Sequence, residues 1–257
     1  MEISTANKKG FCILALRFTS CLFISMSVGA MFFGIPCKAE DKAQPAYYKQ
    51  REHMVRTQIE ARGITSKRVL QALRKVARHK FVPKKYQRQA YEDHPLPIGE
   101  GQTISQPYIV ALMTEILDLD SSKKVLEIGA GSGYQAAVLA EIYAFVYTVE
   151  IIEVLGKKAE KLLADLGYKN IKVKIGDGYL GWQEYSPFDA IIVTCAPSHI
   201  PQPLKDQLAE GGKMVIPVGK VFAQELVLLS KQNGEIRQQA VIPVSFVPMK
   251  GNDGNKY

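Results

Sequence analysis

Short apolar runs alternate with longer amphipathic stretches through most of the second half of the chain. The apolar runs, each long enough for one buried strand, lie at residues 125–128, 145–149, 171–175, 189–194, 214–218 and 226–229. Helical stretches at 134–142 and 153–166 separate the first three runs, and Gly167 provides a stop for the second helix. Strands that alternate with helices of this length predict an α/β fold with a doubly wound, mostly parallel sheet. The Asn233-Gly234 pair is a hairpin signal, so we expect an antiparallel C-terminal edge.

The preceding residues have the pattern of helices and loops. Residues 48–62 predict a helix that ends at Gly63, and Ser66 predicts the cap of a second helix. Residues 83–101 are rich in Pro and Gly and predict a loop, while Pro107 marks the first turn of a third helix. We interpret residues 1–39 as a leader and residues 40–257 as one domain. The domain has two parts, with helices and loops at 48–122 and the sheet at 123–250.

The leader, residues 1–39, has the pattern of a secretion signal. Lys8 and Lys9 form a basic start, residues 18–36 carry no charge, and Ala39 offers a small residue for cleavage. The apolar run is also long enough to remain as a membrane anchor, with membrane contact confined to residues 11–36. A wrongly chosen start codon is the third interpretation. The sequence leaves these three readings open.

Composition narrows the class of protein. Hydrophobic residues make up 47% and charged residues 23% of the 257, which excludes a disordered chain, a collagen and a coiled coil. The formal charge of +8 is spread along the chain, so it does not predict nucleic-acid binding. Outside the leader the only cysteine is Cys195. We therefore expect neither an internal disulfide nor a metal site in the domain.

A glycine-rich turn follows the first strand of the sheet. Gly129, Gly131 and Gly133 have the spacing G-x-G-x-G, whereas the dinucleotide fingerprint is G-x-G-x-x-G. Glycines let the backbone turn tightly and let a ligand approach it closely. Glu127 lies just before the turn. The turn predicts a nucleotide-like cofactor, with these residues in its binding site.

Two further acidic residues fall at strand ends. Glu150 ends the second strand, 17 residues after Gly133, where a carboxylate can accept both hydrogen bonds of a ribose diol. Asp177 and Gly178 follow the third strand, where Asp177 can accept a hydrogen bond from an exocyclic amine. Together with the glycine spacing, these acids favour S-adenosyl-L-methionine over NAD.

Four blocks of sequence resemble the protein-L-isoaspartate O-methyltransferases across roughly residues 50–250. The blocks are LPIGEGQTISQPYIVA at 96–111, VLEIGAGSGYQAA at 125–137, GDGYLGW at 176–182 and PFDAIIVTCAP at 187–197. The first is the most specific, because the cofactor loop marks many methyltransferases. Departures are small: Cys195 replaces a small residue, and Tyr179 stands where Trp is frequent. The resemblance implies the Rossmann-like fold of S-adenosylmethionine-dependent methyltransferases.

The resemblance also implies a reaction. The family methylates the free α-carboxylate of L-isoaspartyl residues in damaged proteins, and the ester then closes to a succinimide that partly reverts to Asp. It implies that Ser105 donates a hydrogen bond to that carboxylate as the catalytic residue, with Thr103 and Ile104 beside it. The run containing Val247 and Pro248 resembles a segment that lines the peptide site. On the residues alone, Ser105 could equally be the N-cap of the helix at Pro107.

The chemistry of this substrate explains which motifs the sequence lacks. A carboxylate with a pKa of about 3.5–4 is already ionised at neutral pH, so it needs no general base. The enzyme must instead align the carboxylate with the methyl group. The sequence accordingly has no Ser-His-Asp order and no G-x-S-x-G, and we interpret His94 and His199 as structural.

We expect the partners to be isoaspartyl-containing proteins and peptides, with no nucleic acid, and the protein to be a monomer. Cofactor supply and the resemblance favour the cytoplasm, whereas residues 18–36 favour export or a membrane anchor. Two alternatives stay open: a tethered, non-catalytic binder of damaged proteins and a small-molecule methyltransferase. The glycine spacing argues against an NAD-dependent oxidoreductase, and the sequence shows neither the aromatic-proline pocket nor the dense basic face of a nucleic-acid methyltransferase.

Overall fold

The computed structural model describes residues 45–118, 121–220, 222–251 and 257. The predictions for the leader therefore lie outside the described residues. No helix within the described ranges is long and apolar enough to cross a membrane. The division of the domain into two parts stays a prediction.

Irregular helices begin the described chain. Helix α2 (Pro45–Met54) continues into a π-helical turn (Val55–Ile59) and a 3₁₀ turn (Glu60–Arg62), which ends at Gly63 with φ +95°. The predicted stop at Gly63 is confirmed, although the predicted single helix is in fact three segments. Helix α3 (Lys67–Lys75) begins after Ser66, whose side chain accepts a hydrogen bond from the Val69 N–H, so the predicted cap is confirmed.

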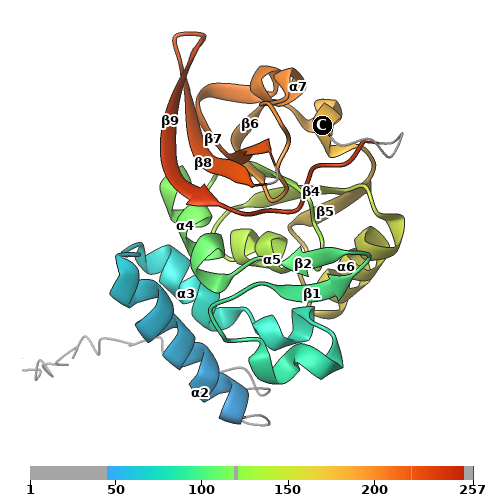
Figure 1. The fold of residues 1–257 in the computed structure, drawn as a ribbon. Helices are drawn as coiled ribbons and strands as arrows, with labels where there is room; N and C mark the ends of the chain where they lie inside the picture. Colours follow the sequence, from blue (N-terminus) through green and yellow to red (C-terminus); the bar gives the residue numbers. More distant parts are fainter. Residues whose placement is uncertain (1–44, 119–120, 221, 252–256) are drawn as a thin grey trace, which may run out of the picture. The chain divides into compact units, whose positions relative to one another are not determined.

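A seven-stranded sheet forms the rest of the framework (Figure 1). Its strands are β3 (Lys124–Ile128), β4 (Phe145–Glu150), β5 (Ile171–Ile175), β6 (Phe188–Val193), β7 (Leu208–Lys220), β8 (Ala223–Gln232) and β9 (Glu235–Val244). The order is β5-β4-β3-β6-β7-β8-β9, with parallel pairing from β5 to β7 and antiparallel pairing beyond. The predicted fold class and the antiparallel C-terminal edge are confirmed. Asn233 (φ 53°) and Gly234 (φ 76°) form the predicted hairpin turn.

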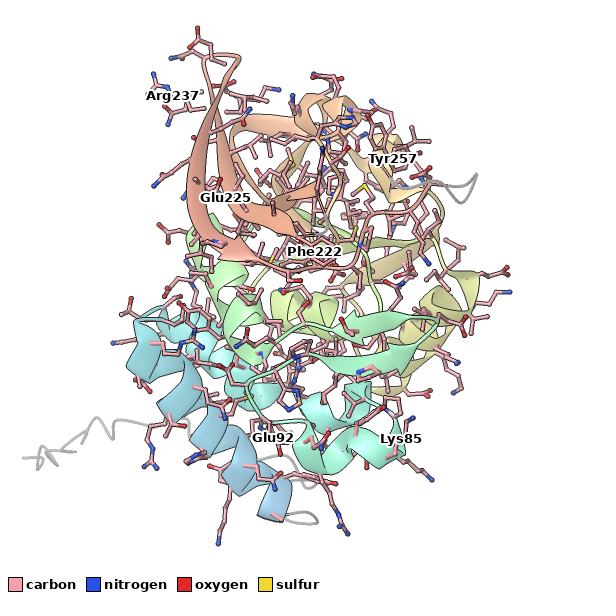
Figure 2. The ribbon with its side chains drawn as sticks, in the orientation of Figure 1. Lys85, Glu92, Phe222, Glu225, Arg237 and Tyr257 are labelled. Atoms are coloured by element: carbon pink, nitrogen blue, oxygen red, sulfur yellow. The ribbon has the colours of Figure 1, made fainter. Side chains whose placement is uncertain are left out.

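Helices cover both faces of the sheet because its strands are apolar on both sides. On one face, Val125, Val146 and Ile192 pack with α4 (Pro107–Leu117), α5 (Tyr134–Ala140) and the N-terminal helices. Helix α6 (Glu153–Asp165) lies against β4 and β5, while α7 (Gln202–Asp206) adds Leu204 to the core of the other face. Charged side chains project from the periphery, among them Lys85, Glu92 and Arg237 (Figure 2).

A small hairpin begins within residues 83–101, which the sequence predicts to be a loop, and ends just after them. Strands β1 (Leu96–Gly99) and β2 (Gln102–Ile104) pair antiparallel, which corrects that prediction. Pro97 favours the prediction of a loop, because proline has no N–H to donate to a neighbouring strand. An edge strand tolerates proline, since one side of it is not paired. Further 3₁₀ turns lie at Arg78–Phe81, Lys84–Gln89, Gly178–Leu180 and Gln183–Tyr185.

The strand order reverses at β3. The chain runs from β3 through β4 to β5 on one side, then returns to place β6 on the other side of β3. Open α/β sheets bind ligands at such a switch point, outside the carboxyl ends of the strands. The segments that follow β3, β4, β5 and β6 meet there.

Candidate active site

The loop after β3 has a backbone that only glycines suit. Gly129, Gly131 and Gly133 have φ values of +97°, +53° and +85°, in the left-handed region. A Cβ on Gly129 would lie 2.5 Å from the Thr194 hydroxyl oxygen, so the loop also packs too tightly for a side chain there. The N–H of Gly129 donates to the Val149 carbonyl at 2.8 Å, which ties the loop to β4. Gly129 and Gly131 thus line the pocket with half-buried backbone, whereas Gly133 is buried and does not line it.

Glu150 lies at the end of β4, beside this loop, and is 5% exposed. The Gly131 N–H donates to its Oε2 at 2.7 Å, and the Ile152 N–H donates to its Oε1 at 2.9 Å. A carboxylate oxygen has more than one acceptor site, so each can still accept a hydroxyl. Glu150 therefore holds the glycine loop and lines the pocket at the same time.

Asp177 lies at the end of β5 with its carboxylate held on both oxygens. The Tyr179 N–H donates to Oδ1 at 2.9 Å, and the hydroxyl of the C-terminal Tyr257 donates to Oδ2 at 2.7 Å. The rings of Tyr179 and Tyr257 stack with centroids 4.1 Å apart. Gly178, which follows, lines the pocket; a Cβ there would lie 2.4 Å from Ile128 Cγ2.

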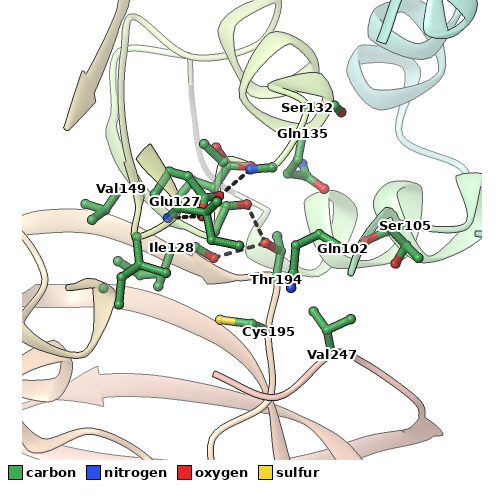
Figure 3. Close-up of a pocket in the computed structure, with 18 of the residues that line it drawn as sticks. Gln102, Ser105, Glu127, Ile128, Ser132, Gln135, Val149, Thr194, Cys195 and Val247 are labelled. Carbon is green, nitrogen blue, oxygen red and sulfur yellow. Dashed lines mark hydrogen bonds between the residues drawn. The ribbon is translucent and has the colours of Figure 1, made fainter. Parts of the chain in front are cut away.

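Glu127 lies in β3 beneath the pocket and has no exposed surface (Figure 3). Burial raises the pKa of its carboxyl to about 8. The Thr148 hydroxyl and the Ala136 N–H lower this pKa, while the charge of Glu150 raises it. Glu127 is therefore mainly neutral at pH 7, and a cation in the pocket would favour its ionised form.

Ser105 stands where the pocket meets a groove. Helix α4 begins at Pro107, and its N-cap is Gln106, without a side-chain cap hydrogen bond. The alternative that Ser105 caps this helix is thus wrong. Ser105 lines the pocket together with Thr103 and Ile104, the other predicted substrate residues (Figure 3).

The groove runs alongside the pocket and is lined by the segment after β9. The residues shared by the groove and the pocket are Thr103, Ser105, Thr194 and Val247. Gln224 clamps this segment, because the Phe246 N–H donates to its Oε1 at 2.6 Å and its Nε2 donates to the Phe246 carbonyl at 3.1 Å. Val247 and Pro248, both predicted, line the pocket beside β6, where the Ala196 N–H donates to the Val247 carbonyl at 2.8 Å.

Some residues of the site escape sequence reasoning. Thr194 follows β6, and its hydroxyl lies 3.0 Å from the Ile128 carbonyl oxygen and 2.7 Å from that of Gly129 (Figure 3). Cys195 lines the pocket, where burial first, then Glu150 and Asp177, raise the pKa of its thiol. Both residues lie in the block at 187–197 that carries the family resemblance, but that block gave neither a role in the site. Tyr257 gave no signal, because its contact with Asp177 joins residues 80 positions apart.

The two histidines that the sequence singles out do not line the pocket. His94 Nε2 lies 2.9 Å from Glu92 Oε2, and hydrogen bonds to the Pro95 carbonyl and to Glu92 raise its pKa. His199 contacts the Tyr179 hydroxyl at 3.2 Å. The pocket therefore holds backbone amides, carboxyl groups and hydroxyls.

Comparison with known proteins assigns the family. The sequence model of the protein-L-isoaspartate(D-aspartate) O-methyltransferases matches residues 49–254. The chain belongs to this family. A protein-L-isoaspartate O-methyltransferase 2 of Shewanella sediminis is 51% identical over 93% of this chain and 96% of its own length. A protein-L-isoaspartate O-methyltransferase of Gloeobacter violaceus is 55% identical over 76% of this chain and 96% of its own.

Solved structures agree with the family assignment. A protein-L-isoaspartate O-methyltransferase superposes with a TM-score of 0.74 at 32% identity, covering 80% of this chain and 67% of its own. A second, from Plasmodium falciparum in complex with S-adenosyl-L-homocysteine, has a TM-score of 0.69 at 28% identity, covering 80% of this chain and 99% of its own. The resemblance inferred from the four blocks is thus confirmed. The roles of individual residues remain predictions.

Proposed function

We propose that the protein transfers a methyl group from S-adenosyl-L-methionine to the free α-carboxylate of L-isoaspartyl residues in damaged proteins and peptides. The observation that carries this proposal is the junction at Ser105, where a pocket built on the glycine loop adjoins a groove lined by the segment after β9. A cofactor in the pocket and an extended peptide in the groove would meet at this residue.

The residues of the pocket fit the cofactor. A Cβ at Gly129 would clash with the Thr194 hydroxyl oxygen at 2.5 Å, so the turn that faces the pocket needs glycine there. Glu150 lines the pocket and retains acceptor capacity for a ribose diol. Asp177 does not line the pocket itself but precedes Gly178, which does, and its carboxylate retains acceptor capacity for an adenine amine. Beneath them, Glu127 is a buried carboxyl that a bound cation would favour in its ionised form. S-adenosyl-L-methionine supplies an electrophilic methyl group on a sulfonium centre.

The chain's own residues have an orienting task. Because the substrate carboxylate is already ionised at pH 7, no residue of the chain has to remove a proton from it. Ser105 donates a hydrogen bond that fixes the attacking carboxylate, and Thr103 and Ile104 bound its position. Val247 and Pro248 offer backbone to an extended peptide, a mode of recognition that tolerates diverse sequences. Orientation of this kind can contribute several kcal/mol to catalysis.

One assay tests the proposal directly. Purified protein is given cofactor labelled in its methyl group and either an isoaspartyl peptide or its twin with normal Asp. Base-labile label should enter the isoaspartyl peptide and not the twin, because only the isoaspartyl residue presents a free α-carboxylate in an extended backbone. Equal labelling of both peptides, or of neither, would contradict the proposal.

We also propose that one copy of the chain suffices and that it works on the cytoplasmic side, where the cofactor is made. The pocket and the groove share Thr103, Ser105, Thr194 and Val247 within a single copy of the chain. Light scattering after size exclusion should therefore give a mass near 28.5 kDa for the full chain, or less if the leader is removed. Damaged proteins of the same compartment are then its partners.

A further inference from the structure

A buried guanidinium lies directly behind Ser105. Arg78 begins the 3₁₀ turn after α3, and it has no exposed surface. Its Nε donates to the Ala90 carbonyl at 2.8 Å, and its Nη2 donates to the Ser105 carbonyl at 2.7 Å. Arg78 thus holds the backbone of the residue at which pocket and groove meet.

This cation has no ion-pair partner among the described residues. Its Nη1 lacks a hydrogen bond there, and no carboxylate of that part of the chain lies within ion-pair distance of it. The carboxylate whose charge it does feel, Asp93, is paired with Arg62 at 2.6 Å. The ring of Tyr134 lies 4.8 Å from the guanidinium carbon and provides partial compensation.

An unpaired buried cation is costly to fold. Guanidinium groups keep their proton in proteins, so Arg78 cannot relieve that cost by becoming neutral. Buried charges are ordinarily paired or neutralised. The carbonyls of Ala90 and Ser105 accept the hydrogen bonds from Nε and Nη2 of Arg78. Because a carbonyl is neutral, the positive charge of Arg78 still has no anion beside it.

We propose that Arg78 is a positioning residue for the reaction: it fixes Ser105 through its carbonyl, and its charge is compensated by the substrate carboxylate when that anion binds at Ser105. This inference rests on the proposed function. It adds a second source of affinity for the free α-carboxylate, one that acts through charge rather than direct contact.

The competing explanation is that Arg78 only ties two loops together. Both explanations predict that Arg78→Met lowers activity, so activity alone does not separate them. They differ in what Arg78→Lys does. A charge effect survives in Arg78→Lys, which keeps the cation, whereas a loop tether is lost in Arg78→Lys as in Arg78→Met, because neither variant keeps the two-armed contact.

The experiment compares two peptides that differ in one group. One is an isoaspartyl peptide, and the other carries a carboxamide in place of its free α-carboxylate. Binding of each is measured by competition in the presence of S-adenosyl-L-homocysteine. We expect the wild-type protein to prefer the carboxylate and Arg78→Met to reduce that preference about 10- to 100-fold, the effect of a unit charge several Å away in a partly buried site. Affinity for S-adenosyl-L-homocysteine should stay within about threefold.

Two further variants make the result decisive. Arg78→Lys keeps the charge but loses the two-armed contact, so it should retain the carboxylate preference while kcat falls. Arg51→Met removes a second buried arginine, 2% exposed, which interacts with Tyr91, and should leave the preference unchanged. Arg78→Lys also keeps the test valid if Arg78→Met does not fold.

Either of two results would overturn the inference. One is a carboxylate preference that survives in folded Arg78→Met; the other is a preference that Arg78→Lys loses as fully as Arg78→Met. Failure of the proposed function is a separate outcome, because wild-type protein would then transfer no methyl group to the isoaspartyl peptide.

Discussion

Removal of the Ser105 hydroxyl tests whether this residue has a catalytic or a structural role. If it orients the substrate carboxylate, Ser105→Ala removes a hydrogen bond to a charged group, worth roughly 1.5–3 kcal/mol. We therefore expect kcat/KM for an isoaspartyl peptide to fall about 10- to 150-fold. Cofactor affinity should change little, because the cofactor contacts proposed above lie on other residues. Steady-state kinetics and calorimetry measure both quantities.

Ser105→Gly provides the control for backbone effects. Since Gln106 is the N-cap of α4, neither substitution removes a helix cap, and the melting temperature should stay close to wild type. Near-normal turnover by a folded Ser105→Gly protein would make Ser105 a structural residue. The carboxylate would then be held by Thr103 or by backbone N–H groups.

Glu127 predicts a pH dependence of stability. Its pKa is about 8 in the folded protein, against an ordinary value of 4.5, because burial disfavours the ionised form. The folded state therefore holds this proton longer than the unfolded state. The contribution of Glu127 to stability should be greatest at low pH and decline as the pH rises from about 4.5 through 8, by up to about 1.4 kcal/mol per pH unit.

Glu127→Gln isolates this contribution, because an amide does not titrate in that range. Thermal melts of both proteins at pH 6 and pH 9 should show a smaller decline for the variant. Other titrating groups, such as His94, are common to both proteins and cancel in the difference. Parallel declines in the two proteins would mean that Glu127 ionises normally.

At the scale of elements, a glycine of the loop after β3 and a glycine at a helix end can be compared as sites of substitution. Gly129 (φ +97°) and Gly63 (φ +95°) have nearly the same backbone conformation. A Cβ on Gly129 would clash with Thr194 at 2.5 Å, whereas a Cβ on Gly63 would meet nothing within 4 Å. Both alanine variants should lose about 1–2 kcal/mol from the positive φ.

Only Gly129→Ala should also weaken cofactor binding, because the clash displaces the loop from Thr194. We expect at least a tenfold loss of affinity by calorimetry, and no change for Gly63→Ala. Comparable cofactor affinities in two folded variants would show that the loop does not need its observed conformation.

Sequence patterns predict those elements whose signals are local. The strands β3, β4 and β6 agree with their apolar runs within about a residue, because buried parallel strands are nearly continuous apolar runs. The edge strand β5 agrees as well, although Lys172 and Lys174 alternate with its apolar residues. The glycine turn, Glu150 and Asp177 could be predicted because each lies at the end of such a strand. The β1–β2 hairpin and the contacts of Arg78 and Tyr257 could not, because they depend on which distant segments fold together.

At the scale of the whole molecule, the site joins three regions of the chain. The sheet provides the pocket through the segments after its strands, the β1–β2 hairpin provides Thr103 and the nearby Ser105, and the C-terminal segment provides Val247 and Pro248. The N-terminal helical part contributes Arg78, which lies behind Ser105 and donates to its carbonyl. Truncation of that part would therefore remove a support of the site as well as core packing.

The compartment of the whole chain is the last testable question. Residues 45–257 make up 83% of the chain, while the Shewanella sediminis relative matches 93% of it. That match therefore extends into residues 1–44, and the predictions for this segment have to be tested on the full chain.

We expect the active enzyme on the cytoplasmic side, because S-adenosyl-L-methionine is made there. An antiserum against residues 45–257 is preferable to a C-terminal tag, since the Tyr257 hydroxyl contacts Asp177. The protein should resist protease added to spheroplasts, whether it sediments with membranes or not. N-terminal sequencing then distinguishes an intact leader from cleavage. A mature chain that starts near Glu40 and is digested from outside would contradict this prediction and would require a cofactor supply beyond the cytoplasm.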